Sequence, residues 1–257
     1  MESRWTFRSK QTAIAWQKKI RDEKRDNYKG VKFWESIDLS LKNAIVREVN
    51  RPTAQKIILE YEWLGDMAIT DKFYGIFFEE YCGGVICINT NGVAIHGHTK
   101  FEIKQNELSY FARGACPFWT PTGTASKLLS YALKFERQRG AKAAIAFVDT
   151  DAGEYGTIYQ ATNWLCIGRG SKSKQFVKGT RVLDNRTFCG MAARRNMSTP
   201  SFARLLVHNG WIEQIANPKY RYAYILAVGD EYKRIYNNIK ELLVDYPKRP
   251  DQNAAAV

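Results

Sequence analysis

One stretch of the sequence, residues 110–168, constrains the fold more than any other. Its pattern predicts a strand, a polar loop, an amphipathic helix, a strand, an acidic loop, a helix and a strand, in that order. The helix is indicated by apolar residues at helical spacing from Ala125 to Leu133, and the apolar run Ala144–Val148 is typical of a buried parallel strand. This alternation predicts an α/β (α+β) architecture, in which ligands bind where strand carboxyl ends meet helix amino ends.

The loops of this stretch carry polar side chains close to the predicted strand ends and helix starts. These are Arg113, Cys116, Ser126, Asp149, Asp151 and Tyr159. Since loops at one edge of an open sheet lie close together, we expect these side chains to converge on one pocket.

The loop Thr120–Ser126 precedes the predicted helix and has the sequence ThrProThrGlyThrAlaSer. Free backbone N–H groups at a helix start can bind an anion. Gly123, Thr124 and Ser126 are therefore candidate cofactor contacts, together with Arg113, whose guanidinium can pair with phosphate.

Several segments resemble the Mom DNA-modification proteins of Mu-like bacteriophages. They are ArgGlyAlaCys at 113–116, SerLysLeuLeu at 126–129, AspThrAspAlaGlyGlu at 149–154 and GlyThrIleTyrGlnAlaThrAsnTrp at 156–164. The order of elements is similar to the second half of a GNAT-type acyltransferase fold. The resemblance spans about residues 45–226, and the segment 149–164 is its most specific part.

The resemblance implies a GNAT-like fold, with a mixed central sheet flanked by helices. It implies a transferase that converts adenine in duplex DNA to N6-(carbamoylmethyl)adenine, which protects phage DNA from restriction in the host bacterial cytoplasm. The 120–126 loop is then expected to receive the donor's pyrophosphate, and Tyr159 to serve as an acid. The family has also been associated with iron, so a divalent metal such as iron remains a possible cofactor.

The chemistry of such a reaction demands a proton acceptor and a proton donor. The exocyclic amine of adenine is a poor nucleophile, so an enzyme must position it and accept its proton. Asp149 or Asp151 can do so, and only one of them need face the pocket. A helix cap is the alternative role for either. Tyr159 can protonate a leaving group, and Ser126 can donate from the helix start.

The donor is not settled by the sequence. Acetyl-CoA enzymes of this fold usually carry an Arg/Gln-x-x-Gly-x-Gly/Ala loop, whereas the 120–126 segment has one glycine and a proline. An acyl-CoA-type donor such as acetyl-CoA and an aminoacyl-tRNA therefore both remain open. A metal could use His96 and His98 with Glu60 or Glu62, although an exposed hairpin tip also explains the two histidines.

Positive charge favours a nucleic-acid partner. The net charge is +13 and the isoelectric point about 9.5. Residues 165–225 hold eleven Lys and Arg against two acidic residues, an excess of nine positive charges. The candidate DNA-binding residues within it are Arg169, Lys172, Lys174, Arg194, Arg195 and Arg204. A second basic run lies within residues 4–29.

We divide the chain into an N-terminal arm, residues 1–38, and a GNAT-like domain, residues 39–257. A basic insertion at about 169–217 precedes the last strand. It is predicted to contain a hairpin, 175–177 with 180–183, and two helices at 187–195 and 200–208. The helices resemble a helix-turn-helix in outline, and a cover for the sheet edge is the alternative.

The remaining features indicate the cellular compartment and the partners of the protein. Five cysteines without disulfide-type spacing, an N-terminus without a secretory signal and the lack of a membrane-length apolar run predict a cytosolic protein with reduced thiols and no membrane partner. Packing is the favoured role even for Cys116. We expect double-stranded DNA and a small-molecule or tRNA-borne donor as partners, and leave a dimer open.

Two other functions compete with this hypothesis. One is a GNAT N-acetyltransferase acting on a protein or a small amine, which predicts an acidic acceptor groove where this chain has the basic 165–225 stretch. The other is a non-catalytic DNA-binding protein with an acyltransferase-like core, against which the retained polar loop residues argue.

Overall fold

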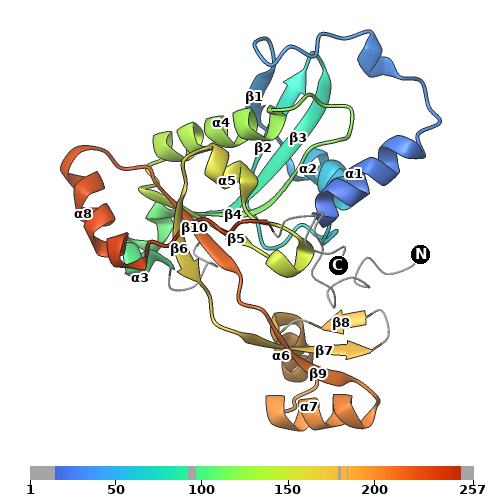
Figure 1. Ribbon diagram of the computed structural model, residues 1–257, viewed down its shortest axis with the longest axis vertical. Helices are drawn as coiled ribbons and strands as arrows, with labels where there is room; N and C mark the ends of the chain where they lie inside the picture. Colours follow the sequence, from blue (N-terminus) through green and yellow to red (C-terminus); the bar gives the residue numbers. More distant parts are fainter. Residues whose placement is uncertain (1–14, 92–96, 179–180, 184, 250–257) are drawn as a thin grey trace, which may run out of the picture.

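A computed structural model describes residues 15–91, 97–178, 181–183 and 185–249. Its body is a seven-stranded sheet in the order β1-β2-β3-β4-β5-β10-β6 (Figure 1). The strands are β1 (Ile45–Glu48), β2 (Lys72–Phe78), β3 (Tyr81–Asn89), β4 (Leu108–Ala115), β5 (Ala143–Val148), β6 (Leu165–Arg169) and β10 (Tyr220–Ile225). β4 and β5 pair in parallel, and the other neighbours pair antiparallel. The predicted mixed central sheet is confirmed.

Helices cover both faces of this sheet. α4 (Thr124–Gln138) and α5 (Thr157–Ala161) lie on one face, over a core that includes the fully buried Trp164 and Tyr222. The opposite face is covered by α2 (Arg51–Tyr61) at one end and by α3 (Gly97–Phe101) and α8 (Gly229–Ile239) at the other. Short 3-10 helices occupy Phe33–Glu35, Gln105–Glu107, Thr150–Ala152 and Lys240–Leu242.

The helix boundaries follow from local chemistry. Asn50 caps α2 by accepting a hydrogen bond from the backbone N–H of Thr53, and Pro52 stands in the first turn, where a missing N–H costs nothing. α4 ends at Gln138, and Gly140 follows it at a φ of +99°, which glycine adopts easily. The helix predicted from the apolar spacing between Ala125 and Leu133 is confirmed.

A buried carboxylate fastens α4 to the sheet. Glu136 is fully buried; its Oε1 accepts from the Tyr74 hydroxyl at 2.8 Å, and its Oε2 from Arg139 Nη2 at 2.8 Å and from the Ser109 hydroxyl. The pKa of Tyr74 is raised by burial and by the charge of Glu136. Since the buried charge has partners on β2, β4 and α4 itself, it fixes how α4 crosses the sheet.

The described part of the arm packs against the body. α1 (Trp16–Asp26) lies beside α2, with an ion pair between Lys24 and Glu60. Beyond it, Tyr28 and Trp34 contact the ring of Phe118 in the loop after β4, with centroids 5.5 and 5.4 Å away. The arm therefore reaches the same end of β4 as the loop that leads into α4.

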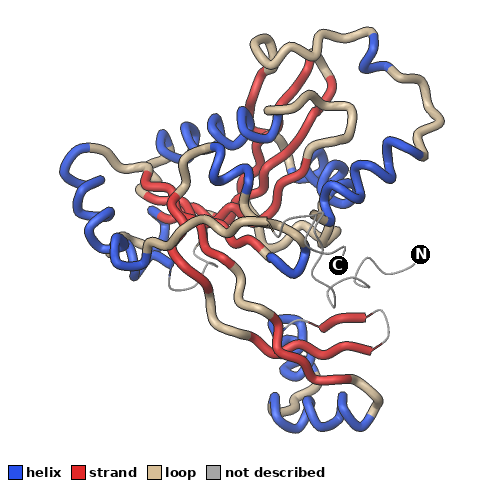
Figure 2. The backbone as a smooth tube through the Cα atoms, viewed as in Figure 1, coloured by secondary structure: helices blue, strands red, loops and turns tan. Residues whose placement is uncertain are grey.

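The segment between β6 and β10 forms a small unit with its own sheet and core (Figure 2). Its elements are β7 (Ser173–Lys178), β8 (Arg181–Leu183), α6 (Asn185–Arg194), α7 (Thr199–His208) and β9 (Ile212–Ala216), with strand order β8-β7-β9. The core holds Phe176, Phe188 and Phe202. The hairpin and both helices are confirmed, and β9 was not predicted. Ser198 caps α7, because its hydroxyl accepts from the N–H of Ser201.

Replacing Glu136 by Ala is expected to destabilise the protein by about 1–3 kcal/mol for each buried hydroxyl that loses its acceptor, those of Tyr74 and Ser109. The free energy of unfolding from urea denaturation measures this loss. Glu35→Ala, which removes an exposed partner of Lys32, is the matched control and should have little effect. Equal losses in the two variants would contradict the role given to Glu136.

Candidate active site

The parallel strands β4 and β5 separate halfway along their length. Their paired residues run from Leu108 with Ala143 to Phe111 with Ala146, and beyond these the strands share no register. β4 continues to Ala115 and β5 to Val148, so each extends past the last pair. Backbone groups in the parted halves need other partners, and the space between the strands is open to a ligand.

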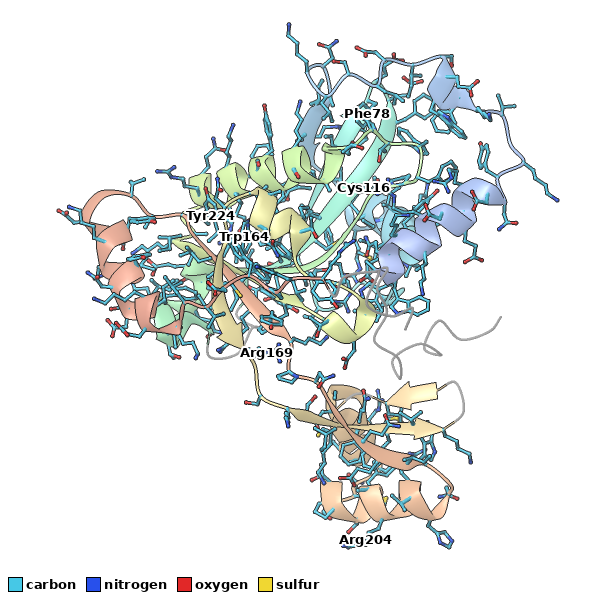
Figure 3. All side chains as sticks on the ribbon, viewed as in Figure 1. Phe78, Cys116, Trp164, Arg169, Arg204 and Tyr224 are labelled. Carbon is cyan, nitrogen blue, oxygen red and sulfur yellow. The ribbon has the colours of Figure 1, made fainter. Side chains whose placement is uncertain are left out.

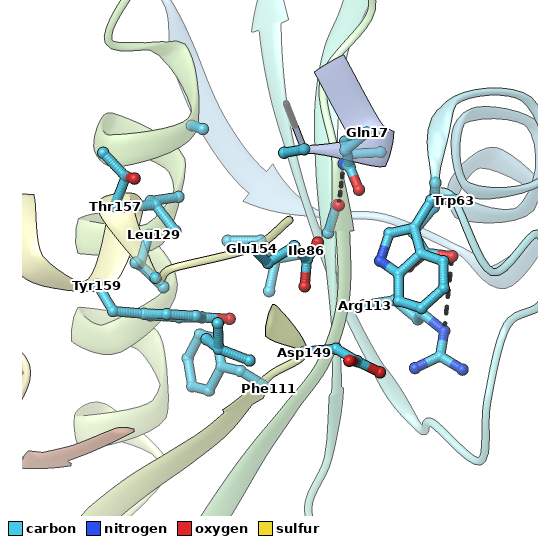
Figure 4. Close-up of a pocket in the computed structure, with 18 of the residues that line it drawn as sticks. Gln17, Trp63, Ile86, Phe111, Arg113, Leu129, Asp149, Glu154, Thr157 and Tyr159 are labelled. Carbon is cyan, nitrogen blue, oxygen red and sulfur yellow. Dashed lines mark hydrogen bonds and ion pairs between the residues drawn. The ribbon is translucent and has the colours of Figure 1, made fainter. Parts of the chain in front are cut away.

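A cavity of about 340 Å³ occupies this opening. Its walls come from the end of β4, the end of β5, the start of α4, the loop before α5, the turn after α2 and the arm. From the arm, the Gln17 side-chain amide donates to the carbonyl of Gly114 at 2.7 Å, which satisfies an edge group of β4 (Figure 4). Trp63 and Phe111 supply apolar wall, and Arg21, Lys219 and Arg249 also line the cavity.

The loop between β5 and α5 carries the ionisable groups into the cavity. Asp149 caps the turn Thr150–Ala152 through its carboxylate and accepts the N–H of Glu154 on its carbonyl. Gly156 then starts α5 at a φ of +72°, and a Cβ atom there would lie 2.5 Å from the Tyr222 ring. Glycine at 156 is therefore required both by the backbone and by the close approach of β10.

Two glutamates have raised pKa values in this cavity. Burial, reinforced by the charges of Glu62 and Asp149, raises the pKa of Glu154 to about 8, with Lys219 opposing. Burial raises the pKa of Glu62 to about 7, against the charge of Arg113 and two backbone N–H groups that Glu62 accepts. Figure 4 shows the Glu154 carboxyl pointing into the middle of the cavity.

Asp149 and Asp151 have different surroundings. Asp149 lines the cavity and forms an ion pair with Lys219 at 3.2 Å. Asp151 points the other way, to a separate hollow at the foot of the insertion, where it accepts from the backbone N–H and the amide of Asn217. One of the two faces the main cavity, and it is Asp149, because the 3-10 turn Thr150–Ala152 interrupts the extended chain between them.

Tyr159 lies on α5 with its hydroxyl directed into the cavity (Figure 4). Its ring packs against Trp164 and Tyr222, with centroids 4.9 and 5.3 Å away. Burial, together with the charge of Glu154, raises its pKa. The phenol therefore holds its proton at neutral pH and can donate it.

Arg113 lines the cavity but is already held by acidic partners. Its Nη2 lies 2.7 Å from the Asp66 carboxylate, and its Nε lies 3.8 Å from Glu62. Nε also donates to the backbone carbonyl of Asp66. This arrangement fixes the turn after α2 against β4 and brings Glu62 to the cavity.

The other candidate cofactor residues form the start of α4. Gly123 precedes the helix at a φ of +93°, and the buried Thr124 hydroxyl donates to the carbonyl of Pro121. The N–H groups of Thr124 and Lys127 are bonded within this turn. Ala125 lines the cavity, so the helix start faces it, whereas Ser126 is half-buried outside the cavity lining.

Cys116 is a packed thiol. Burial raises its pKa to about 12, so it stays protonated at neutral pH, as a core residue should.

Within the described ranges no group of three His, Cys, Asp or Glu side chains could hold a metal ion. His96 lies outside those ranges, as does the side chain of His98. Glu60 pairs with Lys24 and Glu62 with Arg113, so these two face different neighbours.

The candidate DNA-binding residues are all exposed. They are Arg169, Lys172, Lys174, Arg194, Arg195 and Arg204. Figure 3 shows Arg169 where the chain leaves the body and Arg204 on α7 at the far end of the insertion. Lys174 pairs with Glu213, and Arg195 lies 5.1 Å from the ring centre of Phe202.

No described helix is long and apolar enough to cross a membrane.

Sequence reasoning missed three contributors to the cavity. Glu154, Lys219 and Gln17 come from segments whose meeting depends on the fold. Of these, Glu154 alone had a signal, since it closes the AspThrAspAlaGlyGlu segment at 149–154 and stands directly before the helix that carries Tyr159.

A mixed sheet with one parallel pair that parts midway, flanked by helices on both faces, defines the GNAT-like acetyltransferase fold. The chain is similar in structure to RimL, a ribosomal alpha-N-protein acetyltransferase, at 13% identity and a TM-score of 0.41, covering 75% of this chain and 99% of that one. It is also similar to FeeM, an N-acyl amino acid synthase from uncultured soil microbes, at 14% identity and a TM-score of 0.42, covering 72% and 91%. A Bacillus subtilis acetyltransferase in complex with CoA matches at 8% identity and a TM-score of 0.38, covering 72% and 98%.

The chain belongs to the Mom protein family. The family profile matches residues 43–248, which include the whole sheet, the cavity-lining loops and the insertion. Comparison with curated proteins gives no match. The predicted family and fold are both confirmed.

The raised pKa of Glu154 makes stability depend on pH. Its pKa is about 8 in the folded protein against an ordinary 4.5, so between these values the folded state keeps a proton that the unfolded state releases. The contribution of Glu154 to the free energy of unfolding is therefore fully present below about pH 4.5 and is lost as the pH rises to about 8. Glu154→Gln removes it, so we expect the variant to gain stability relative to the native protein from pH 5 to pH 8. Urea denaturation at each pH measures the free energy of unfolding, with Glu35→Gln as the exposed control. If the free energies of the native protein and of Glu154→Gln changed in parallel with pH, the prediction would be contradicted.

Proposed function

We propose that this protein is a DNA-modifying transferase that converts adenine in duplex DNA to N6-(carbamoylmethyl)adenine and so shields phage DNA from restriction. Membership of the Mom family supports DNA adenine modification. The observation that carries the site assignment is the cavity between the parted ends of β4 and β5, where Asp149, Glu154 and Tyr159 meet.

Within that cavity, proton transfers can be assigned to two side chains. Asp149 is the proposed acceptor of the proton that the exocyclic amine loses as its nitrogen bonds to the incoming carbon. Its ion pair with Lys219, at 3.2 Å, holds the carboxylate at the cavity wall. Tyr159 is the proposed donor of a proton to the leaving group, since its raised pKa keeps the phenol protonated.

The donor is proposed to lie at the start of α4. This end of the helix carries a positive dipole and faces the cavity through Ala125, so an anionic donor group fits there. Both an acyl-CoA-type donor and an aminoacyl-tRNA have such groups. Arg113 is proposed to position Glu62 and the turn after α2, because its guanidinium is engaged by Asp66.

Duplex DNA is proposed to lie along the insertion, residues 169–217, and to reach the cavity mouth. The exposed arginines of α6 and α7 suit phosphate contacts. The mouth itself is basic, since Arg21, Lys219 and Arg249 line the cavity. A strand bound there places a base next to the carboxyl groups.

Nucleosides from plasmid DNA co-expressed with the protein should contain the modified adenine by mass spectrometry. Tyr159→Phe and Asp149→Asn should each lower its yield about a hundred- to ten-thousand-fold, because each removes one proton-transfer group. Asp151→Asn is the matched control: it lies outside the cavity and should keep most of the yield. Unmodified DNA with folded native protein would sink the proposal, and acetylated protein or amines instead would favour the N-acetyltransferase alternative.

Replacing Arg194, Arg195 and Arg204 by Gln should weaken duplex binding and flatten its salt dependence. Each phosphate contact contributes about 0.9 to the slope of log affinity against log salt, so the slope should fall by up to about 3. Fluorescence anisotropy at several salt concentrations measures it. The control is Lys233, Arg234 and Lys240→Gln on and after α8, which removes as much charge from another part of the surface. Equal slopes in both triple variants would mean that α6 and α7 serve as structural cover.

A further inference from the structure

The Glu154 carboxyl is a group that the proton transfers above do not use. It points into the middle of the cavity (Figure 4), and among the described residues no side chain forms a hydrogen bond or an ion pair with it. Its own backbone is held, because its N–H donates to the carbonyl of Asp149 at 3.2 Å. A carboxyl that lacks a side-chain partner in the described part of the chain is available to a ligand.

The charges around this carboxyl favour its neutral form. Glu62 from the turn after α2 and Asp149 from the end of β5 repel a third negative charge, and Lys219 before β10 is the opposing cation. The other ionisable groups that line the same cavity are Arg21, Tyr110, Arg113, Cys116, Tyr155, Tyr159 and Arg249. With its pKa at about 8, Glu154 carries a proton at neutral pH and presents one donor beside one acceptor.

Adenine offers the complementary pair of groups. Its exocyclic amine is a donor, and the ring nitrogen next to it is an acceptor. A charged carboxylate has acceptors alone, so it would place a lone pair against that ring nitrogen. The neutral acid matches both groups at once.

We infer that the Glu154 carboxyl holds the edge of an extruded adenine, its carbonyl oxygen accepting from the exocyclic amine and its O–H donating to the neighbouring ring nitrogen. This inference rests on the proposed function, because it takes adenine as the substrate. No covalent step is involved, and the second amine proton is left for Asp149.

The position of Glu154 requires that the base leave the helix stack. The carboxyl lies inside a cavity of about 340 Å³ between β4, β5 and α5, which a stacked base cannot reach. That volume is within the range of about 300–1,000 Å³ typical of small-ligand sites. Trp63, Phe111 and Tyr159 line the cavity with aromatic surface against which a flipped base can pack.

The test is the affinity for a duplex with one adenine opposite an abasic site, compared with the same duplex carrying purine, which lacks the amine. The native protein should prefer adenine about tenfold at pH 6.5, corresponding to about 1.4 kcal/mol for one hydrogen bond. It should bind both duplexes more weakly at pH 9.5, where the ionised carboxylate places a lone pair against the ring nitrogen that both bases carry. Glu154→Gln, whose amide carries a donor and an acceptor at every pH, should prefer adenine at both pH values. Glu154→Leu should show no preference at either.

Two outcomes overturn the inference: a native protein that binds adenine and purine equally at pH 6.5, or a Glu154→Gln variant that folds, binds duplex and shows no preference. The first would remove the contact, and the second would mean that the charged carboxylate is needed. If the native protein prefers adenine but no modified nucleoside forms, the proposed function fails and the binding role of Glu154 stands. Circular dichroism of each variant separates loss of binding from loss of fold.

Discussion

The parting of β4 and β5 after Phe111 and Ala146 is the constraint on which the rest of the structure depends. Parallel strands that stop sharing hydrogen bonds leave backbone groups that need partners, and they leave room between them. At Gly114 the partner is in the arm, where the side chain of Gln17 donates to the Gly114 carbonyl. The space between the strands forms the cavity, and the hydrogen bonds of the buried Glu136 hold α4 beside it.

The cavity brings three carboxyl groups together with four cations, Arg21, Arg113, Lys219 and Arg249. Burial and the charges of Glu62 and Asp149 raise the pKa of Glu154, and the charge of Lys219 opposes them. Burial likewise raises the pKa of Glu62, and the charge of Arg113 opposes it. Neutral Glu154 and protonated Tyr159 can donate, while Asp149, paired with a cation, can accept. A site that must remove one proton from an amine and supply another to a leaving group needs such unequal neighbours.

The insertion has a core of its own, and none of its described residues lines the cavity. Its aromatic core around Phe176, Phe188 and Phe202 makes it a packed unit, so its basic residues can face outwards. Asp151 fastens its foot to the loop that also carries Asp149 and Glu154. The insertion, where we propose duplex contacts, and the cavity, where we propose the chemistry, are therefore connected through one loop.

The sequence by itself determined the order of helices and strands from residue 45 onwards, since apolar periodicity, Asn50 and Pro52 act locally. It also determined that Asp149 and Tyr159 lie at strand and helix ends. Only the tertiary structure decided that β9 forms, that Asp149 and not Asp151 faces the cavity, and that Glu154 is a site residue. The physical reason is that the raised pKa of Glu154 comes from burial and from Glu62 and Asp149, and charges brought together by folding have no signature in the spacing of residues.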